Sequence, residues 1–356
     1  MRSSVYFLVS SLKNESPVKA LASLGNNLDP KYFNVYVVIL FDDFTLLDRF
    51  NRNINLINLS SGSIFNKFIR FKSILKNDNY KKVSISYGII GDLLNFIFLP
   101  YFNYSISNIR GTLYELYILK YGKFFGKVLL GLHNALIKNN DFVFVLNSNI
   151  QSYYKYRFIG KNHIIFNNFI DSDKYPKIAH NNKNNGVVKF VFLGSLSKEK
   201  GFYLLIDLFE RLYNDGYLFH LFLIGSSPNN DICIKQFVSS KLPKSCYSLL
   251  GYLDNPFEYV VESNYLIHPS YSEGTPRSAL ESLHYNIPVI IREAVSNGLI
   301  QNKINGFVFN NDDDLYHILF DILNKSIVIE GDVFMPIDFT KDFNVNRINN
   351  FLKNLK

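Results

Sequence analysis

The chain has 356 residues, of which 47% are hydrophobic and 19% are charged. A domain usually has ~100–200 residues, so we expect two domains, and this composition allows sizeable cores and excludes wholesale disorder. The 2 cysteines, Cys233 and Cys246, exclude a disulfide framework and a cysteine metal cluster, and we expect both to be buried free thiols.

The formal net charge is +8, and the Lys and Arg residues are scattered rather than grouped in one block. A basic balance fits nucleic acid, an anionic membrane surface or phosphate-bearing substrates. The apolar run Val5–Val9 is far too short to cross a membrane, and no other stretch reaches ~18 uncharged apolar residues. We therefore expect a soluble, cytoplasmic protein.

The N-terminal residues predict the βαβ unit of a parallel sheet. Val5–Val9 is typical of a strand, Pro17–Leu24 of a helix, and Val35–Leu40 of a strand that is apolar enough to be buried on both faces. Further short strands are expected at Ile54–Leu59 and Lys82–Ser86.

Between those two strands, Phe65–Lys72 interleaves basic and aromatic residues in helical turns. Such a segment can rest on a membrane surface or pack its Phe face inside, and we favour the packed helix.

The segment Tyr104–Gly111 predicts a strand that ends at Arg110. In an α/β sheet, a residue at the carboxyl end of a strand points toward the crevice where ligands bind, so Arg110 is a candidate site residue. His133 lies on an apparent helix, Lys127–Lys138, and is expected to be structural. Strands are expected at Phe142–Leu146 and His163–Phe166.

The polar stretch Lys177–Gly186 shows no apolar periodicity and predicts an interdomain linker. A strand at Val187–Leu193 follows, then a loop and a helix at Phe202–Tyr213. Lys200 stands just before that helix, where a positive charge opposes the helix dipole, so we expect it to hold an anion. Lys198 is a second candidate for the same role.

The segment from Tyr265 to Ile291 predicts a strand, a loop, a helix and a second strand. His268 ends the first strand and is expected to be packed. Thr275 is predicted to be the N-cap of the helix, with Pro276 at the first helical position.

Two carboxylates frame that helix start. Glu273 immediately precedes the predicted cap, and Glu281 lies six residues beyond Thr275, roughly 9 Å along the helix axis. The backbone N–H groups and the positive end of the dipole between them suit a phosphate. A ligand with hydroxyls at both ends and a diphosphate in the middle fits this arrangement, which is the chemistry of a nucleotide sugar. Arg277 can face the phosphate or solvent.

The stretch from Glu273 to Glu281, followed by Pro288-Val-Ile, resembles the E-x7-E signature of retaining GT-B glycosyltransferases, most closely glycosyltransferase family 4. The resemblance implies that Glu273 bonds to the donor sugar and that Glu281 holds the ribose hydroxyls. The loop after Val187–Leu193 resembles the family's G-R-L-x-x-x-K-G pattern in Gly194, Lys200 and Gly201, although Ser195 stands at the Arg position. Lys200, aided by Lys198, would then clamp the donor diphosphate.

Other family elements are matched in part. The resemblance implies that the turn at Gly251 and Tyr252 cradles the base and that Ser270, Gly274 and Thr275 offer loop contacts to the donor. Arg110 stands where many members have a His, and since Arg does not release its proton, an acid–base role there is not expected.

The resemblance implies an α/β protein with the GT-B architecture, in which two Rossmann-like domains face a cleft. The expected boundaries are 1–176 for an acceptor-side domain, 177–186 for a linker, 187–338 for a donor-binding domain, and 339–356 for a terminal helix that packs on the first domain. The acidic run Asp312–Asp314 is interpreted as the start of a helix rather than a metal site.

The implied reaction is retaining transfer of a sugar from a nucleotide diphosphate donor to a hydroxyl acceptor, with no cofactor or metal. The acceptor expected by analogy is a lipid-linked or surface glycan such as an O-antigen, capsule or exopolysaccharide, used in the cytoplasm at the inner face of the membrane. Two alternatives remain open. Ser195 and Arg110 suit a non-catalytic relative that binds a nucleotide sugar or a partner, and the net charge suits a nucleic-acid-binding protein.

Overall fold

A computed structural model describes residues 2–155, 157–158, 160–178, 186–227, 231–329 and 333–355. The chain divides into two compact units, one formed by the residues up to Phe169 and from Lys341 onward, the other by Ile170–Thr340. The domain boundaries expected from the sequence stay a prediction. Most of the predicted linker, residues 179–185, lies outside the described residues.

The first unit is built on a parallel sheet of seven described strands, as its apolar β segments predict. The strand order is β3-β2-β1-β4-β5-β6-β7, and every pairing is parallel. The strands are β1 (Ser3–Val9), β2 (Phe33–Ile39), β3 (Asn55–Asn58), β4 (Lys81–Tyr87), β5 (Tyr104–Ile109), β6 (Phe142–Val145) and β7 (Asn162–Ile165).

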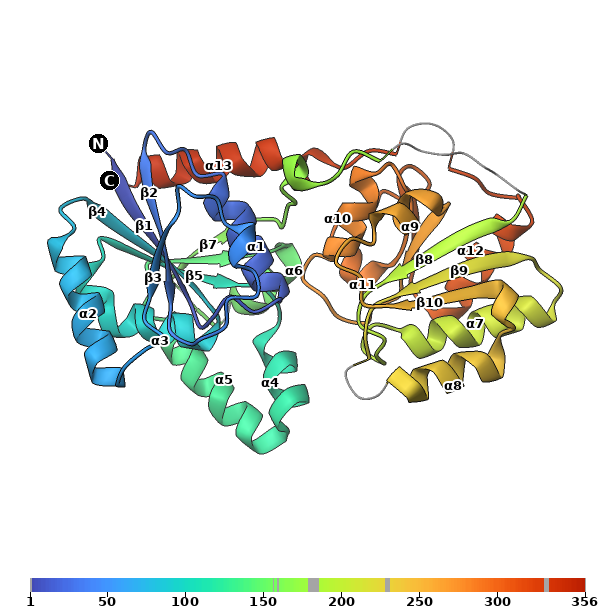
Figure 1. Cartoon of the computed structure of the whole chain (residues 1–356), viewed down its shortest axis with the longest axis horizontal. Coiled ribbons are helices and arrows are strands. Elements are labelled where there is room, and N and C mark those ends of the chain that lie inside the picture. Colours follow the sequence, from blue (N-terminus) through green and yellow to red (C-terminus); the bar gives the residue numbers. More distant parts are fainter. Residues whose placement is uncertain are drawn as a thin grey trace. The chain divides into compact units, whose positions relative to one another are not determined.

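Helices cover both faces of this sheet (Figure 1). They are α1 (Ser16–Asn26), α2 (Ile64–Asn77), α3 (Gly88–Phe98), α4 (Leu113–Tyr121), α5 (Lys123–Ile137), α6 (Ser148–Lys155) and α13 (Lys341–Asn354). Alternate residues of β1 face opposite ways, because side chains of a strand alternate. Val5 and Phe7 pack with α1 and α13, whereas Tyr6 and Leu8 pack with α2 and α3.

The second unit holds a parallel sheet of six described strands in the order β10-β9-β8-β11-β12-β13. The strands are β8 (Val188–Leu193), β9 (Phe219–Ile224), β10 (Tyr247–Gly251), β11 (Tyr265–His268), β12 (Val289–Arg292) and β13 (Gly306–Phe309). The helices are α7 (Phe202–Asn214), α8 (Asp231–Lys241), α9 (Phe257–Glu262), α10 (Arg277–His284), α11 (Glu293–Ser296) and α12 (Asp312–Leu323).

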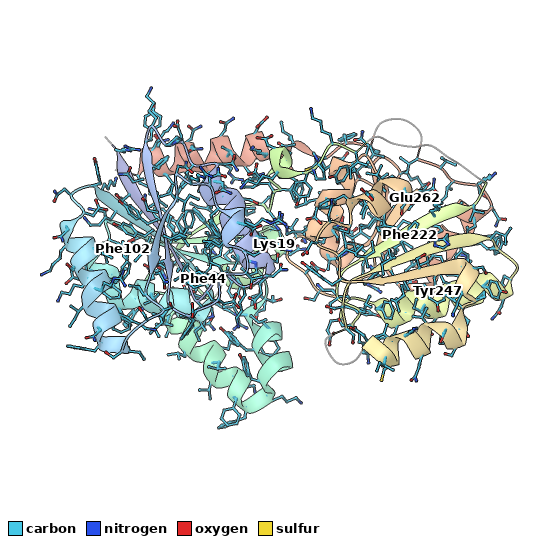
Figure 2. The ribbon with its side chains drawn as sticks, viewed as in Figure 1. Lys19, Phe44, Phe102, Phe222, Tyr247 and Glu262 are labelled. Atoms are coloured by element: carbon cyan, nitrogen blue, oxygen red, sulfur yellow. The ribbon has the colours of Figure 1, made fainter. Side chains whose placement is uncertain are left out.

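Two apolar layers sandwich this second sheet. Helices α7, α8 and α12 pack on one face and α9, α10 and α11 on the other (Figure 1). Phe222 of β9 lies on the second face, where its ring centroid is 5.3 Å from that of Tyr259 in α9 (Figure 2 labels Phe222). The expectation of two α/β domains with parallel sheets is therefore confirmed.

Four local predictions need correction. Cys246 is buried, but Cys233 is exposed, because α8 turns Ile234 and Val238 inward instead. In α2, Phe71 is buried while Phe65 is exposed, so the helix packs only part of its aromatic set inside. The terminal helix begins at Lys341, since Thr340 has an extended backbone, with ψ 152°, and Phe339 belongs to a short 3-10 helix, Ile337–Phe339. The fourth concerns the start of α10 and belongs to the site below.

The structural role expected for His133 is confirmed. Its Nε2 atom lies 2.6 Å from Asp92 Oδ2, and its Nδ1 atom lies 2.8 Å from the hydroxyl of Tyr117. Asp92 also accepts a hydrogen bond from Ser86 at 2.6 Å, so this buried group ties α3, α4 and α5 to β4. The longest helix, α5, has 15 residues, and among the described residues no helix has the length and apolar character needed to cross a bilayer.

Candidate active site

Two loops meet at the carboxyl edge of the second sheet. One runs from Gly194 to Gly201 after β8, and the other from Pro269 to Pro276 after β11. β8 and β11 are neighbours, and the strand order changes direction between them. The carboxyl ends of strands at such a switch point are where α/β sheets bind ligands.

The two loops are joined by short contacts. Ser270 and the backbone N–H of Tyr271 both donate hydrogen bonds to the carbonyl of Glu199, at 3.3 and 3.0 Å. Gly201 has a φ of +71°, and a Cβ at this position would lie 2.5 Å from the carbonyl oxygen of Pro269. Only glycine meets both conditions, so this residue lets the loops approach closely.

Lys200, predicted to bind the donor diphosphate, and Glu273, predicted to bind the donor sugar, form an ion pair across this junction. Lys200 Nζ lies 2.6 Å from Glu273 Oε1, and His268 Nε2 lies 2.9 Å from the same oxygen. The Lys200 side chain is 32% exposed and the Glu273 side chain is 17% exposed. The packed state expected for His268 is confirmed, since it is buried and its Nδ1 atom is 3.1 Å from Ser278 Oγ.

The charges around Glu273 fix its ionisation. Burial by itself would raise the pKa of this carboxyl group, but His268 and Lys200 act against burial and lower the pKa to about 2. Glu273 is therefore an anion at neutral pH, and its oxygens can accept hydrogen bonds from hydroxyl groups of a ligand.

The start of α10 differs from the prediction by one position. The helix begins at Arg277, and Pro276 occupies the N-cap position that was assigned to Thr275. Pro276 has φ −70° and ψ 121°, so its ring satisfies the usual proline φ while its ψ remains extended. Thr275 is buried, and the N-cap of the helix still lies only three residues beyond Glu273.

Glu281, the predicted ribose ligand, lies one helical turn beyond Arg277. Tyr175 donates a hydrogen bond to Glu281 Oε1 at 2.8 Å, and Arg277 Nη2 donates to the Tyr175 oxygen at 3.0 Å. The Arg277 side chain therefore contacts Tyr175 and is only 14% exposed, so it does not extend into solvent. Burial and the charge of Glu281 raise the pKa of Tyr175 above its ordinary value, against the effect of Arg277.

Tyr175 was not found from the sequence. It follows the Asn168–Asp171 element by only a few residues, and nothing in its local pattern marks it as a neighbour of a residue in α10. In the sequence, Tyr175 looks like any aromatic residue of an exposed loop, because its neighbours in the chain are polar.

The remaining donor-side candidates lie on turns at the same edge of the sheet. The N–H of Gly194 donates to Ile224 at 3.0 Å, and that of Gly225 donates to Gly251 at 2.8 Å, so the turns after β8, β9 and β10 are linked. Ser195 Oγ lies 3.5 Å from the carbonyl oxygen of Ser226. Lys198 and Tyr252 are exposed beside them.

Two further residues hold the loop that carries Glu273. Asn297 donates a hydrogen bond to the carbonyl of Gly274 at 2.6 Å. Arg292, buried at the end of β12, lies 4.4 Å from the ring centroid of Tyr271 and pairs with Asp312 at 3.1 Å. The sequence showed an Arg after an apolar strand, but only the fold places it under the loop.

Arg110 belongs to the first unit. It follows β5 directly, as predicted, and its charge acts on Tyr87, whose pKa burial nonetheless raises to about 12. Its role toward a substrate stays a prediction. Asp312–Asp314 form the first turn of α12, where Asn311 accepts a hydrogen bond from the N–H of Asp314, in agreement with a helix start.

Known proteins resemble this chain in sequence and in fold. Residues 188–324 match the family model described as Glycosyl transferases group 1. The capsular polysaccharide biosynthesis glycosyltransferase CapM of Staphylococcus aureus is 24% identical over 166 residues, 46% of this chain and 43% of CapM. The O-antigen biosynthesis glycosyltransferase WclY of Escherichia coli is 26% identical over 195 residues, 53% of this chain and 50% of WclY. The chain thus spans half or less of the length of these two curated relatives.

Among solved structures, Anabaena Alr3699/HepE in complex with UDP and glucose matches with a TM-score of 0.76 at 16% sequence identity, over 99% of both chains. At that identity the likeness speaks for the fold. It agrees with the two parallel-sheet units described above. The chain therefore has the GT-B fold, and the part of it that resembles glycosyl transferases group 1 in sequence is residues 188–324.

Proposed function

We propose that this protein is a retaining glycosyltransferase that moves a sugar from a nucleotide diphosphate donor to a hydroxyl acceptor. The observation that carries the proposal is the ion pair between Lys200 and Glu273, 2.6 Å apart where β8 and β11 end. A cation for a diphosphate and an anion for sugar hydroxyls then lie side by side at the start of α10. A helix start adds N–H groups and a positive dipole to the same place.

In the proposed reaction, the bond between the anomeric carbon and the diphosphate oxygen breaks. The acceptor oxygen forms a bond to the same face of that carbon, and its proton passes to the departing diphosphate. Lys200 stabilises the charge that grows on the diphosphate, while Glu273 orients the sugar. Glu281 holds the ribose hydroxyls, and its contact with Tyr175 fixes the carboxylate before the donor arrives.

The names of similar proteins support the proposed donor and acceptor classes. CapM and WclY are named for capsule and O-antigen biosynthesis, and Alr3699/HepE was solved with UDP and glucose. These names support a UDP-sugar or related donor and a lipid-linked or surface glycan acceptor. No metal or cofactor takes part in the proposed reaction, and contact with the inner face of the membrane would bring the enzyme to such an acceptor.

Thermal unfolding with UDP, GDP, ADP and CMP tests the donor site. A ligand that binds only the native state stabilises it by about 2.7 kcal/mol at a hundredfold excess over Kd. We expect one nucleotide to raise the Tm of the wild type and of Lys235→Ala, which changes an exposed lysine of α8, but not that of Lys200→Ala.

Turnover is tested with the nucleotide sugar of the base that binds. NMR of the product is expected to show the anomeric configuration of the donor. Nucleotide binding without turnover on any hydroxyl acceptor would favour the non-catalytic relative. The absence of binding by all four nucleotides would contradict the proposed donor site itself.

A further inference from the structure

Helices α4 and α5 form a hairpin that projects from the sheet of the first unit (Figure 1). The two helices meet at Gly122 and pack closely, since a Cβ at Gly126 would lie only 2.6 Å from the carbonyl oxygen of Tyr117. The contact between His133 and Tyr117 ties them further along. The two helices of the hairpin are therefore held together by packing and by a hydrogen bond. The tip of the hairpin carries the first residues of α5.

The outer side of α5 is apolar. Phe124 is 74% exposed and Phe125 is 68% exposed, and Val128 and Leu132 continue the stripe of Phe124 at four-residue spacing. Residues four apart lie on the same face of a helix, so these side chains form one surface. The opposite side of α5 holds Leu130 and other residues of the core.

The neighbouring helices extend this surface. Helix α3 contacts α5 through Asp92 and His133, and its exposed positions beyond the first residue are Leu93, Phe96 and Ile97. Helix α2 packs on α3 through Phe71 and Phe98, with ring centroids 4.8 Å apart. It exposes three further large apolar side chains, Ile64, Phe65 and Ile69. We call the exposed side of α2, α3 and α5 the apolar–basic face.

All exposed charges on these three helices are positive. Helix α5 carries Lys123 and Lys127, and α2 carries Arg70, Lys72 and Lys76. The one acidic residue in the three helices, Asp92 of α3, is buried against His133. A surface that combines exposed Phe side chains with Lys and lacks exposed carboxylates is complementary to anionic lipid headgroups above an apolar layer.

We infer that the apolar–basic face binds the surface of an anionic lipid bilayer, with the tip of the α4–α5 hairpin inserted at Phe124 and Phe125. The inference deepens the proposed function, because it names the surface through which the enzyme would reach a lipid-linked acceptor. A protein partner fits less well, since Lys is depleted in protein–protein interfaces. The charge of each Lys and the area of each Phe contribute separately to binding.

Flotation of the full-length protein with vesicles tests this surface. Vesicles of phosphatidylcholine alone are compared with vesicles in which one third of the lipid is phosphatidylglycerol, at low and at high salt. We expect strong binding only to the anionic vesicles at low salt. Each basic residue near such a surface contributes about fivefold, so changing both Lys123 and Lys127 to Gln is expected to weaken binding about 25-fold.

The Phe pair is changed to Ser at 124 and 125, and the matched control is Leu218→Ser, which alters a side chain that is 74% exposed in the second unit. We expect the control to float like the wild type and the double Phe variant to lose at least tenfold in binding to vesicles. Circular dichroism and nucleotide-dependent thermal shifts of the double variant are expected to match those of the wild type. A match would show that the double variant is folded and that it lost only the membrane-binding surface.

The same assay separates this inference from the proposed function. Lys200→Ala is expected to lose nucleotide binding and still float, whereas the double Phe variant shows the reverse. A wild type that binds nucleotide but neither kind of vesicle would overturn the inference and leave the enzyme proposal standing. Equal binding by the wild type and the double Phe variant would also overturn it. A wild-type dimer in solution that becomes a monomer in the double Phe variant would assign the face to a second copy of the chain.

Discussion

At the scale of single residues, the site depends on charges that are buried next to one another. Glu273 is ionised because Lys200 and His268 are within 3 Å, although burial acts in the opposite direction. A buried carboxylate without such partners would be destabilising, so the three groups form one electrostatic unit. The sequence motif named Lys200 and Glu273, but not their mutual contact.

This unit predicts a pH dependence of stability. The pKa of Glu273 lies at about 2 in the native protein, below the usual 4.5. The stabilisation is therefore fully present above about pH 5 and is lost as the pH falls toward 2, and it amounts to about 3 kcal/mol at about 1.4 kcal/mol per pKa unit. Urea unfolding of the wild type and of Glu273→Gln should differ most at neutral pH and converge in acid. A difference that stays constant down to about pH 3 would contradict the lowered pKa.

A second prediction concerns Tyr175. Changing it to Phe removes the hydroxyl that donates to Glu281 and accepts from Arg277, at 2.8 and 3.0 Å. We expect a loss of about 1–3 kcal/mol in the free energy of unfolding, because two buried polar groups lose a partner. If Glu281 holds the ribose, nucleotide Kd also rises in isothermal titration. Tyr213→Phe, on the exposed side of α7, serves as the control and should leave both quantities unchanged.

At the scale of elements, the loop after β11 is held in place by contacts with the last residue of β12, Arg292. Arg292 stacks on Tyr271 and Phe309, with distances of 4.4 and 4.9 Å from its guanidinium carbon to the ring centroids. It also pairs with Asp312 of α12. A planar guanidinium makes stacked and ionic contacts at once, which a Lys ammonium does not.

We therefore predict that Arg292→Lys recovers only part of what Arg292→Ala loses. The Ala variant is expected to unfold about 2 kcal/mol more easily, with faster hydrogen exchange in the loop from Pro269 to Gly274. The reason is that a buried guanidinium loses two ring contacts and its ion pair with the exposed Asp312. Arg347→Ala, on the exposed side of α13, controls for removal of a surface Arg. Full rescue by Lys would show that charge alone holds the loop.

At the scale of the whole molecule, the last helix returns to the first unit. In α13, Ile348 and Leu352 are buried in the core that contains β1 and β2, and Phe351 lies 5.2 Å from Phe142 between ring centroids. Asn349 accepts a hydrogen bond from the N–H of Asp29 at 3.0 Å. The first unit is thus completed by residues that are more than 150 positions away from the rest of it in sequence.

This predicts a local effect of a distant mutation. Ile348→Ala creates a cavity in the first unit and should cost about 2–5 kcal/mol there. Hydrogen exchange followed by mass spectrometry is expected to accelerate in β1 and β2 and to remain unchanged in β8 and β11. An equal acceleration in both units would mean that they unfold together, contrary to two independent cores.

The sequence by itself determined the sheets and the positions of the main motifs. Runs such as Val35–Leu40 are apolar at successive positions, and a strand can be so only if both of its faces are covered, which requires a parallel sheet between helices. Lys200 and Glu273 were found because each stands at a βα junction, where backbone geometry and chemistry are local. These features depend on neighbours in the chain, so the order of residues is sufficient.

The tertiary structure alone decided the contacts between segments far apart. Tyr175 reaches Glu281, Arg292 supports Tyr271, and the apolar side of α5 is left exposed, and none of these follows from periodicity. An apolar stripe such as that of Phe124 predicts a buried helix face whether or not a neighbour covers it. Only the packing of the whole unit tells a core face from an exposed one, because burial is a property of what lies opposite a residue.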